Sequence, residues 1–479
     1  MLNRREFSKA LIVTGGAILA GSSKRTWAAS RNASSESGVN SDSRPWDQVS
    51  GILYRIKPPT FPDRIFDITK FGAIGDNKTE NTDAFSRAIA ACANAGGGQV
   101  LLPAGEFLSA AIHLKTNVNL HLSNRAVLRF TRDPAKYPIV LTRFEGVELM
   151  NFSPFIYAFE QDNIAITGSG TIDGNADASH WWDWKSRTRS NKDPSATPND
   201  RDVLFRMAES GRPVNERVFG EGHYLRPQFI QPYRCKNVLI EGVTLLNSPM
   251  WQIHPVLCTN VTVRSLNINA DGPNTDGCDP ESCTDVLIDN CTFNTSDDCI
   301  AIKSGRNADG RRIGVPSQNI VVRNCQMKNG HGGVTIGSEI SGGVRDVFAD
   351  NCQMDSPHLD NAIRIKNNAM RGGKIENIYA RNINVGEVAA AAVSTDYFYE
   401  EGKAGQFVPI VQGVSIEKLT TRKSNYAVFL RGFENDPIRR VDLIDCDFNR
   451  VQERSVVENV TGVSLRNVRI NGKPVQRLS

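Results

Sequence analysis

Three aspartates stand close together in the middle of the sequence, in two short motifs. Asp276 closes the Asn-Thr-Asp of residues 274–276, and the adjacent pair Asp297 and Asp298 follows soon after it. Neighbouring carboxyl groups cannot all ionise freely, so the pKa of one rises and that group can serve as an acid beside a base. An acid and a base flanking one bond are what glycoside hydrolysis requires. The trio therefore predicts acid–base chemistry on a sugar.

Cationic side chains follow the aspartates at a regular spacing. His331 lies in Gly-His-Gly-Gly, and Arg364 begins an Arg-Ile-Lys that ends at Lys366. The step from Asp298 to His331 equals the step from His331 to Arg364. An imidazole can orient an acid or tune its pKa. A guanidinium and an ammonium bind carboxylates, the guanidinium through a two-pronged hydrogen bond, so these residues favour an acidic sugar as the substrate.

The segments that must position these residues repeat along the chain. Short alternating β-branched stretches recur at nearly regular intervals. The clear copies begin at Asn163, Asn237, Asn260, Asp285, Asn319, Asp346 and Asn377, and the weaker ones at Val414, Val441 and Val463. Alternation with a period of two predicts strands with one buried face. Because such strands bury that face only when coils stack, we predict an all-β solenoid, a single-stranded parallel β-helix.

Stacking would bring the chemical motifs together. Equivalent positions in successive coils lie about 4.8 Å apart, so the carboxylates, the imidazole and the two cations would line one strip of surface. The segment Thr82–Asn94 has a helical pattern, with Asp83 near its start and glycines after its end. We expect this helix to cap the N-terminal end of the solenoid and block edge pairing.

The N-terminus has the pattern of an export signal. Residues 1–29 combine a basic start containing two adjacent arginines, a short apolar run and a small-residue end, which resembles a twin-arginine signal. The apolar run is too short and too rich in glycine to span a bilayer comfortably. We expect residues 30–60 to form a linker or extended segment. Residues 61–479 should form the catalytic β-helix, with a long insertion around residues 175–226.

Charge and composition limit the partners. The segment 1–29 carries the whole net charge of +4, so the remaining chain is near neutral and nothing points to nucleic acid. We expect a periplasmic or secreted monomer with an acidic polysaccharide or oligogalacturonide as substrate. After signal removal we expect no stable association with a membrane.

The ten cysteines allow two interpretations. Several of them recur at similar places in the repeats, which stacked buried thiols explain as well as disulfides do. A twin-arginine substrate folds in a reducing compartment, and this favours thiols. The cysteines and histidines do not have zinc-site spacing, and we expect neither a metal nor a cofactor.

Together the motifs resemble those of the polygalacturonases of glycoside hydrolase family 28, and among these the bacterial exo-acting members. That family carries Asn-Thr-Asp, Gly/Gln-Asp-Asp, Gly-His-Gly and Arg-Ile-Lys in this order. The sequence departs from it at Ser296, before the aspartate pair, and the resemblance extends from about Phe66 to the C-terminus. It implies a right-handed β-helix that hydrolyses α-1,4-galacturonide linkages of pectin with inversion.

The resemblance also implies roles for single residues. Asp297 would be the general acid and His331 would support it, whereas Asp276 and Asp298 would hold and activate water. Substrate binding would fall to Asn274, Arg364, Lys366 and Tyr397.

Other functions stay open at this point. A calcium-dependent pectate lyase shares the β-helix but needs clustered calcium-binding carboxylates and a basic residue, which these motifs do not suggest. A non-enzymatic, tailspike-like β-helix would bind carbohydrate without cleaving it. A rhamnogalacturonan hydrolase would belong to the same family.

The long segment from Asp173 to Arg226 bears on how a polymer is cut. A long loop can wall off one end of a cleft, and we therefore expect cutting from a chain end. Trp181 and Trp182 within it suit sugar stacking and plain packing equally well.

Overall fold

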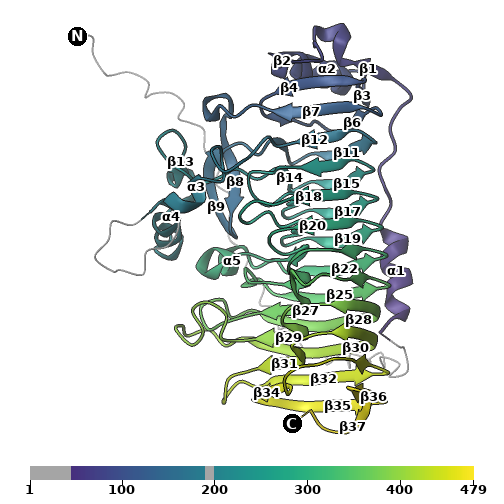
Figure 1. Cartoon of the computed structure of the whole chain (residues 1–479). Helices are drawn as coiled ribbons and strands as arrows, with labels where there is room; N and C mark the ends of the chain where they lie inside the picture. The colour runs from purple at the N-terminus through teal and green to yellow at the C-terminus, as the bar shows by residue number, and fades with distance from the viewer. Residues whose placement is uncertain (1–44, 189–198, 479) are drawn as a thin grey trace, which may run out of the picture. The chain divides into compact units, whose positions relative to one another are not determined.

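The chain winds as a parallel β-helix in the computed structural model, which describes residues 45–188 and 199–478 (Figure 1). The predicted all-β class and solenoid architecture are confirmed. The expected export signal, residues 1–29, lies outside the described residues, as do residues 30–44 of the expected linker. Among the helices that are described, none has the length and apolar character needed to cross a membrane.

The coils contribute strands to three faces of the solenoid, which we term the first, second and third sheets. The first sheet contains β1 (Ile65–Asp67), β3 (Gly98–Leu102), β6 (Val118–Leu122), β11 (Asp162–Gly168), β15 (Lys236–Glu241), β17 (Thr259–Arg264), β19 (Thr284–Asp289), β22 (Ser317–Arg323), β25 (Val344–Asp350), β28 (Lys374–Glu387), β30 (Ile410–Lys423), β32 (Ile438–Ile444) and β35 (Val460–Arg466). The second contains β2 (Asp76–Glu80), β4 (Gly105–Ser109), β7 (Ala126–Phe130), β12 (Thr171–Asp173), β16 (Thr244–Leu246), β18 (Asn267–Ala270), β20 (Thr292–Thr295), β23 (Gln326–Met327), β26 (Gln353–Met354), β33 (Asp447–Phe448) and β36 (Val468–Ile470), which the short β37 (Lys473–Val475) joins antiparallel. The third contains β5 (Ile112–His113), β10 (Ile156–Phe159), β14 (Ile230–Tyr233), β21 (Ile300–Ile302), β24 (Gly330–Ile336), β27 (Leu359–Lys366), β29 (Ala391–Asp396), β31 (Tyr426–Arg431) and β34 (Val456–Glu458). Strands β28 and β30 run through the corner between the first and second sheets.

The register of the first sheet shows that each predicted repeat is one coil. Val238 pairs with Val261, Val261 with Val286, and the column continues through Ile320 to Val347. All five side chains are buried. A fully buried aliphatic side chain contributes about 1.5–3 kcal/mol relative to an exposed one. The repeating pattern therefore sets both the coil length and the core.

Asparagines turn the chain at the start of these strands. Asn163, Asn237 and Asn260 have φ angles of 54°, 56° and 59°, in the left-handed region. Their side chains form a ladder, because the Asn237 amide donates to Asn163 (2.8 Å) and the Asn260 amide donates to Asn237 (2.6 Å). Asn tolerates this backbone and satisfies its amide along the stack.

Substitution of Asn237 separates these two contributions. Asn237→Ala loses the ladder bonds and leaves at positive φ a residue whose side chain, unlike that of Asn, cannot offset the strain by a local hydrogen bond, and this strain costs about 1–2 kcal/mol. Asn237→Gly loses only the ladder bonds. We expect both variants to melt below the parent protein, with Ala lower than Gly in thermal denaturation. Equal melting of the two variants would show that backbone strain contributes nothing here.

Within the described ranges, five helices decorate the solenoid. They are α1 (Asp47–Arg55), α2 (Thr82–Asn94), α3 (Trp184–Arg187), α4 (Asp200–Glu209) and α5 (Asn307–Ile313), with 3-10 turns η1 (Ile68–Phe71), η2 (Pro134–Lys136) and η3 (Val214–Glu216). The predicted helix Thr82–Asn94 is confirmed as α2 with the same bounds. It buries Phe85 and Ile89 in the solenoid core, over the first coil, as expected of a cap.

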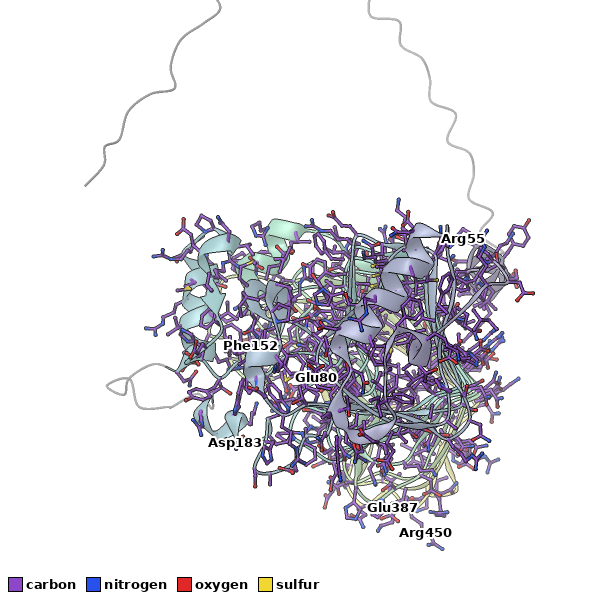
Figure 2. The ribbon with its side chains drawn as sticks, turned by 90° about the horizontal axis from the view of Figure 1, so that it is seen from above. Arg55, Glu80, Phe152, Asp183, Glu387 and Arg450 are labelled. Carbon is purple, nitrogen blue, oxygen red and sulfur yellow. The ribbon has the colours of Figure 1, made fainter. Side chains whose placement is uncertain are left out.

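The prediction of a linker or extended segment over residues 30–60 is wrong for residues 47–55. These form α1, whose Ile52 packs against Leu287, Val321 and Phe348 on the outside of the first sheet. Arg55 binds Asp285 with a 2.6 Å ion pair and lies at the periphery when the solenoid is viewed from above (Figure 2). Outward-facing apolar residues in three neighbouring strands need a cover, and α1 supplies it.

Two excursions leave the coils on one side of the third sheet. Between Asp173 and Ile230 the chain forms α3, α4, η3 and β13 (Val218–Phe219), with residues 189–198 not described. The sequence pattern did not reveal the other excursion, an antiparallel hairpin of β8 (Ile139–Phe144) and β9 (Val147–Phe152). β13 pairs with β9, and the two excursions share an apolar cluster that includes Leu149, Leu204 and Trp251. They belong to the same compact unit as the coils.

All ten cysteines lie in the described ranges, and each is buried with a free thiol. Cys235, Cys258 and Cys283 lie in successive coils, where their Sγ–H groups face backbone carbonyls. The thiol interpretation is therefore confirmed.

Candidate active site

The three aspartates lie where the chain enters the third sheet. Asp276 comes two residues before Cys278, which bridges to Ile300 at the start of β21. Asp297 and Asp298 precede that strand, with only Cys299 between them and Ile300. One carboxylate oxygen of each aspartate lies within 4.8 Å of those of the other two. The coil therefore brings the trio together as its spacing predicts.

Asp298 is the most enclosed of the three. It is fully buried, Lys366 Nζ lies 2.6 Å from one carboxylate oxygen, and the Thr335 hydroxyl donates to the other at 2.9 Å. Arg364 lies 3.6 Å away and is the more exposed cation, at 20% of its side chain against 7% for Lys366. The ion pair with Asp298 thus neutralises the charge of Lys366. The more exposed Arg364 is therefore better placed to bind a ligand.

Asp297 is held by three hydrogen bonds. His331 Nδ1 lies 3.0 Å from one carboxylate oxygen, the Asp298 N–H donates to the same oxygen at 2.9 Å, and the Asn274 amide donates to the other at 3.2 Å. The bond to Asp297 raises the pKa of His331 to about 9. Burial works to raise the pKa of Asp297, but the His331 bond and the nearby cations outweigh it and lower that pKa. The pair therefore holds one proton at neutral pH, mainly on the imidazole.

The pKa of Asp276 is shifted in the opposite direction to that of Asp297. Its side chain is buried, and burial together with the charge of Asp297 raises its pKa well above the usual range. Lys303 Nζ, 3.7 Å away, works against this rise. Of Asp276 and Asp297, Asp276 therefore keeps a proton more readily in the free protein, whereas the resemblance implies that Asp297 is the acid. Because the charges of Asp276, Asp297 and His331 act on one another, protons can redistribute among these three groups when substrate binds.

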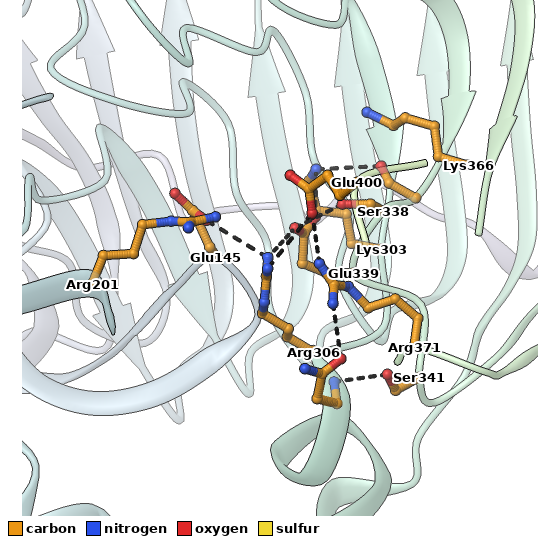
Figure 3. Close-up of polar contacts among 12 residues, drawn as sticks. Glu145, Arg201, Lys303, Arg306, Ser338, Glu339, Ser341, Lys366, Arg371 and Glu400 are labelled. Atoms are coloured by element: carbon orange, nitrogen blue, oxygen red, sulfur yellow. Dashed lines mark hydrogen bonds and ion pairs between the residues drawn. The ribbon is translucent and has the colours of Figure 1, made fainter. Parts of the chain in front are cut away.

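Several charged residues of the site were missed by sequence reasoning. Lys303 Nζ lies 3.1 Å from Glu339 and 4.2 Å from the centre of a Trp251 ring. Arg306 lies 3.2 Å from Glu339 and 3.7 Å from Glu145, in the network drawn in Figure 3. Lys303 follows the aspartate pair directly after β21, a signal that could have identified it. Glu145, Arg306 and Glu339 lie in irregular segments that carry no repeat.

The assignment of Tyr397 to the substrate site is wrong. Tyr397 is fully buried in the core, where its hydroxyl accepts a hydrogen bond from the Val411 N–H at 2.8 Å. Tyr399 faces the site instead, with its ring centre 5.1 Å from Lys366 Nζ and 5.6 Å from the Arg364 guanidinium. Both tyrosines follow the end of β29, where alternation no longer distinguishes inward from outward side chains.

A pocket opens beside the trio. Its lining includes Asn274, Lys303, Glu339, Lys366 and the three aspartates. Four other parts of the fold also contribute side chains to it: the β8–β9 hairpin (Glu145), α3 (Lys185), α4 (Arg201) and the segment after β29 (Tyr399 and Glu400).

Trp181 does not line this pocket, because it is buried and packs against Tyr137 and Phe155. Trp182 donates its indole N–H to the Ser248 carbonyl at 2.9 Å. Packing therefore accounts for both tryptophans.

The trio is also the described group best spaced to hold a cation. Lys366 and Lys303 already place positive charge 2.6 Å and 3.7 Å from two of its carboxylates. This balance leaves little electrostatic incentive for a divalent ion.

Comparison with known proteins identifies the family that the motifs resemble. A family model, that of the glycosyl hydrolases family 28, matches residues 220–469, which is more than half of the chain. The chain belongs to this family. It is therefore a glycosidase, and the binding-only and lyase alternatives are set aside.

Individual relatives support this membership in the family. The crystal structure of an exopolygalacturonase from Thermotoga maritima is 44% identical, with a TM-score of 0.84 over 89% of this chain and 96% of that one. A "probable polygalacturonase" of Vitis vinifera is 29% identical over 77% of this chain and 71% of its own length. An exo-poly-alpha-D-galacturonosidase of Dickeya chrysanthemi is 28% identical over 71% of this chain and 58% of its own.

Proposed function

We propose that this glycosidase hydrolyses α-1,4-galacturonide linkages from a chain end. The observation that carries the proposal is the aspartate trio with its His331 and Arg364 partners, enclosed on one side by the hairpin and the insertion. The trio provides acid and base within one pocket, and Arg364 provides a positive charge for an acidic sugar. The relatives named for exo-cleavage of polygalacturonate support the choice of substrate.

The roles follow from the contacts. The His331–Asp297 pair holds one proton, which moves from the imidazole to Asp297 when substrate binds. Asp297 then passes this proton to the leaving glycosidic oxygen, and the pair is left as a neutral imidazole and a carboxylate. A water molecule bound to Asp276 and Asp298 loses its proton to Asp298, whose charge Lys366 stabilises, and attacks the anomeric carbon. Asp276 orients that water.

Direct attack by water inverts the anomeric carbon, so an α-linkage gives a β-product. The carboxylate oxygens of the trio lie within 4.8 Å of one another, closer than the roughly 6.5–9.5 Å separation common in inverting enzymes. The anomeric configuration of the first product is therefore an informative test.

The hairpin favours exo action because it lies across the outer face of the third sheet. Thr142 of β8 donates to Gln231 of β14 at 2.6 Å, which anchors the hairpin on one coil. At its tip, the Gly146 carbonyl accepts from the Arg306 N–H at 3.0 Å, beyond β21. We infer from these contacts that the hairpin bridges the face on the N-terminal side of the trio, so that a polymer extends past Arg364 toward the C-terminal coils.

Product analysis tests this proposal. Wild-type protein incubated with polygalacturonate, with and without EDTA, should release galacturonate monomer or dimer from the first minutes, equally in both. An early ladder of oligomers would refute exo action, and cleavage of rhamnogalacturonan alone would move the activity to another substrate of the family. An unsaturated product that requires calcium would refute hydrolysis.

We also propose that the protein acts as a monomer in the periplasm or outside the cell, exported through residues 1–29. The ten free thiols fit folding in a reducing compartment before export. Replacing Arg4 and Arg5 together by lysine should retain the full-length protein in the cytoplasmic fraction. Unchanged export in cell fractionation would show that the paired arginines are not the signal.

A further inference from the structure

Among the described residues that line the pocket beside the trio, one cation is left without a partner. Arg201 is paired with Glu145 at 2.7 Å, Lys303 with Glu339 at 3.1 Å and Lys366 with Asp298 at 2.6 Å. Lys185 of α3 also lines this pocket. Across residues 45–188 and 199–478, its ammonium group has no hydrogen bond or ion pair with any side chain or carbonyl.

A half-buried ammonium group without a partner is costly. Desolvation lowers the pKa of Lys185, and the nearby carboxylate of Glu145 only partly offsets this effect. Lys185 is only part-buried at the pocket lining, so its ammonium keeps part of its hydration, and an anion that enters the pocket would supply the partner it lacks. The position of Lys185 is therefore better suited to the bound state than to the free protein.

Lys185 and Arg364 reach the trio from different parts of the fold, because Lys185 lines the pocket beside the trio whereas Arg364 lies outside that lining, 3.6 Å from Asp298. Lys185 belongs to the insertion that, with the hairpin, closes the N-terminal side, whereas Arg364 belongs to β27, two strands beyond β21 in the third sheet. A galacturonide carries one carboxylate on each sugar. The two sugars that flank the cleaved bond would therefore each meet one cation, and the sugar on the closed side must be the chain end.

We propose that Lys185 binds the carboxylate of the terminal galacturonate and so determines that the enzyme accepts an acidic chain end. The proposal rests on the proposed function, since it assigns a sugar to the closed side of the same site. It makes Lys185 a specificity-determining residue that the family motifs do not include.

The test combines a variant with a modified substrate. Lys185→Met is assayed on digalacturonate and on a disaccharide whose non-reducing sugar is galactose instead of galacturonate. Wild type should prefer digalacturonate by about 10- to 100-fold in kcat/KM, the usual value of one charge-assisted hydrogen bond. The variant should lose most of that preference, mainly through KM, and Lys185→Arg should restore part of it.

The controls separate the possible failures. Arg187→Met changes a cation on the same short helix whose side chain is half exposed and faces Asp183, and it should keep the wild-type preference. The Lys185→Met variant should melt at or above the wild-type temperature, because it removes an unpaired charge. Wild-type protein that cleaves neither disaccharide nor polygalacturonate would refute the proposed function. Wild-type activity with an undiminished preference in Lys185→Met would refute this inference alone.

Discussion

Asp297→Asn should lower kcat on galacturonides by about 10³-fold and change KM by only a few-fold, the usual size of a general-acid contribution. Asparagine has the shape of aspartate and can still accept the hydrogen bond from the Asp298 N–H. It cannot carry the proton that the leaving oxygen needs. Substrate binding depends on other side chains, so the loss should appear in the chemical step.

Initial rates on trigalacturonate, with thermal denaturation of the same samples, check this expectation. Asp162→Asn is the matched control, because Asp162 begins β11 on the first sheet and is exposed. It should retain wild-type kcat. A kcat for Asp297→Asn within tenfold of wild type would mean that another group delivers the proton, and the raised pKa of Asp276 makes that residue the next candidate.

His331→Ala should move the alkaline limb of the pH–rate profile to lower pH by about two units or more and lower kcat by about 10- to 100-fold. The pKa of His331 is raised to about 9 by Asp297, so the pair keeps its proton below that pH and loses it as the pH rises through it. Without the imidazole, Asp297 must hold the proton alone, and a carboxyl group does so only at lower pH.

The measurement is kcat/KM between pH 4 and 10 for both proteins, since this ratio reports the free enzyme. His331→Gln is a useful second variant, because it keeps a hydrogen-bond donor to Asp297 without a titrating ring. An alkaline limb that stays in place in both variants would exclude His331 from the protonation of the acid.

The parts of the fold that sequence predicts are those that repeat. Each coil places one β-branched strand in register with the next, as in the column from Val238 to Val347, so a period of two and a fixed coil length are enough to define the solenoid. The same spacing brings Asp276 beside Asp297 and Asp298. The helix Thr82–Asn94 was predictable because a helical pattern with clear ends stands out among strands.

The parts that sequence misses depend on contacts without a period. The docking of α1 depends on Leu287, Val321 and Phe348, whose outward direction an apolar strand does not reveal. Tyr397 and Tyr399 differ only in how a turn directs them. Glu145 enters the site because a hairpin crosses the third sheet, and that crossing rests on a bond between Thr142 and Gln231, which lie far apart in the sequence.

Proton NMR of wild-type protein acting on trigalacturonate tests the central claim most directly. We predict that the anomeric signal of β-galacturonate monomer appears first, that the α-anomer follows only by mutarotation, and that no vinyl proton of an unsaturated uronate forms. A vinyl signal, or an α-anomer that appears first, would contradict hydrolysis by a water molecule held between Asp276 and Asp298.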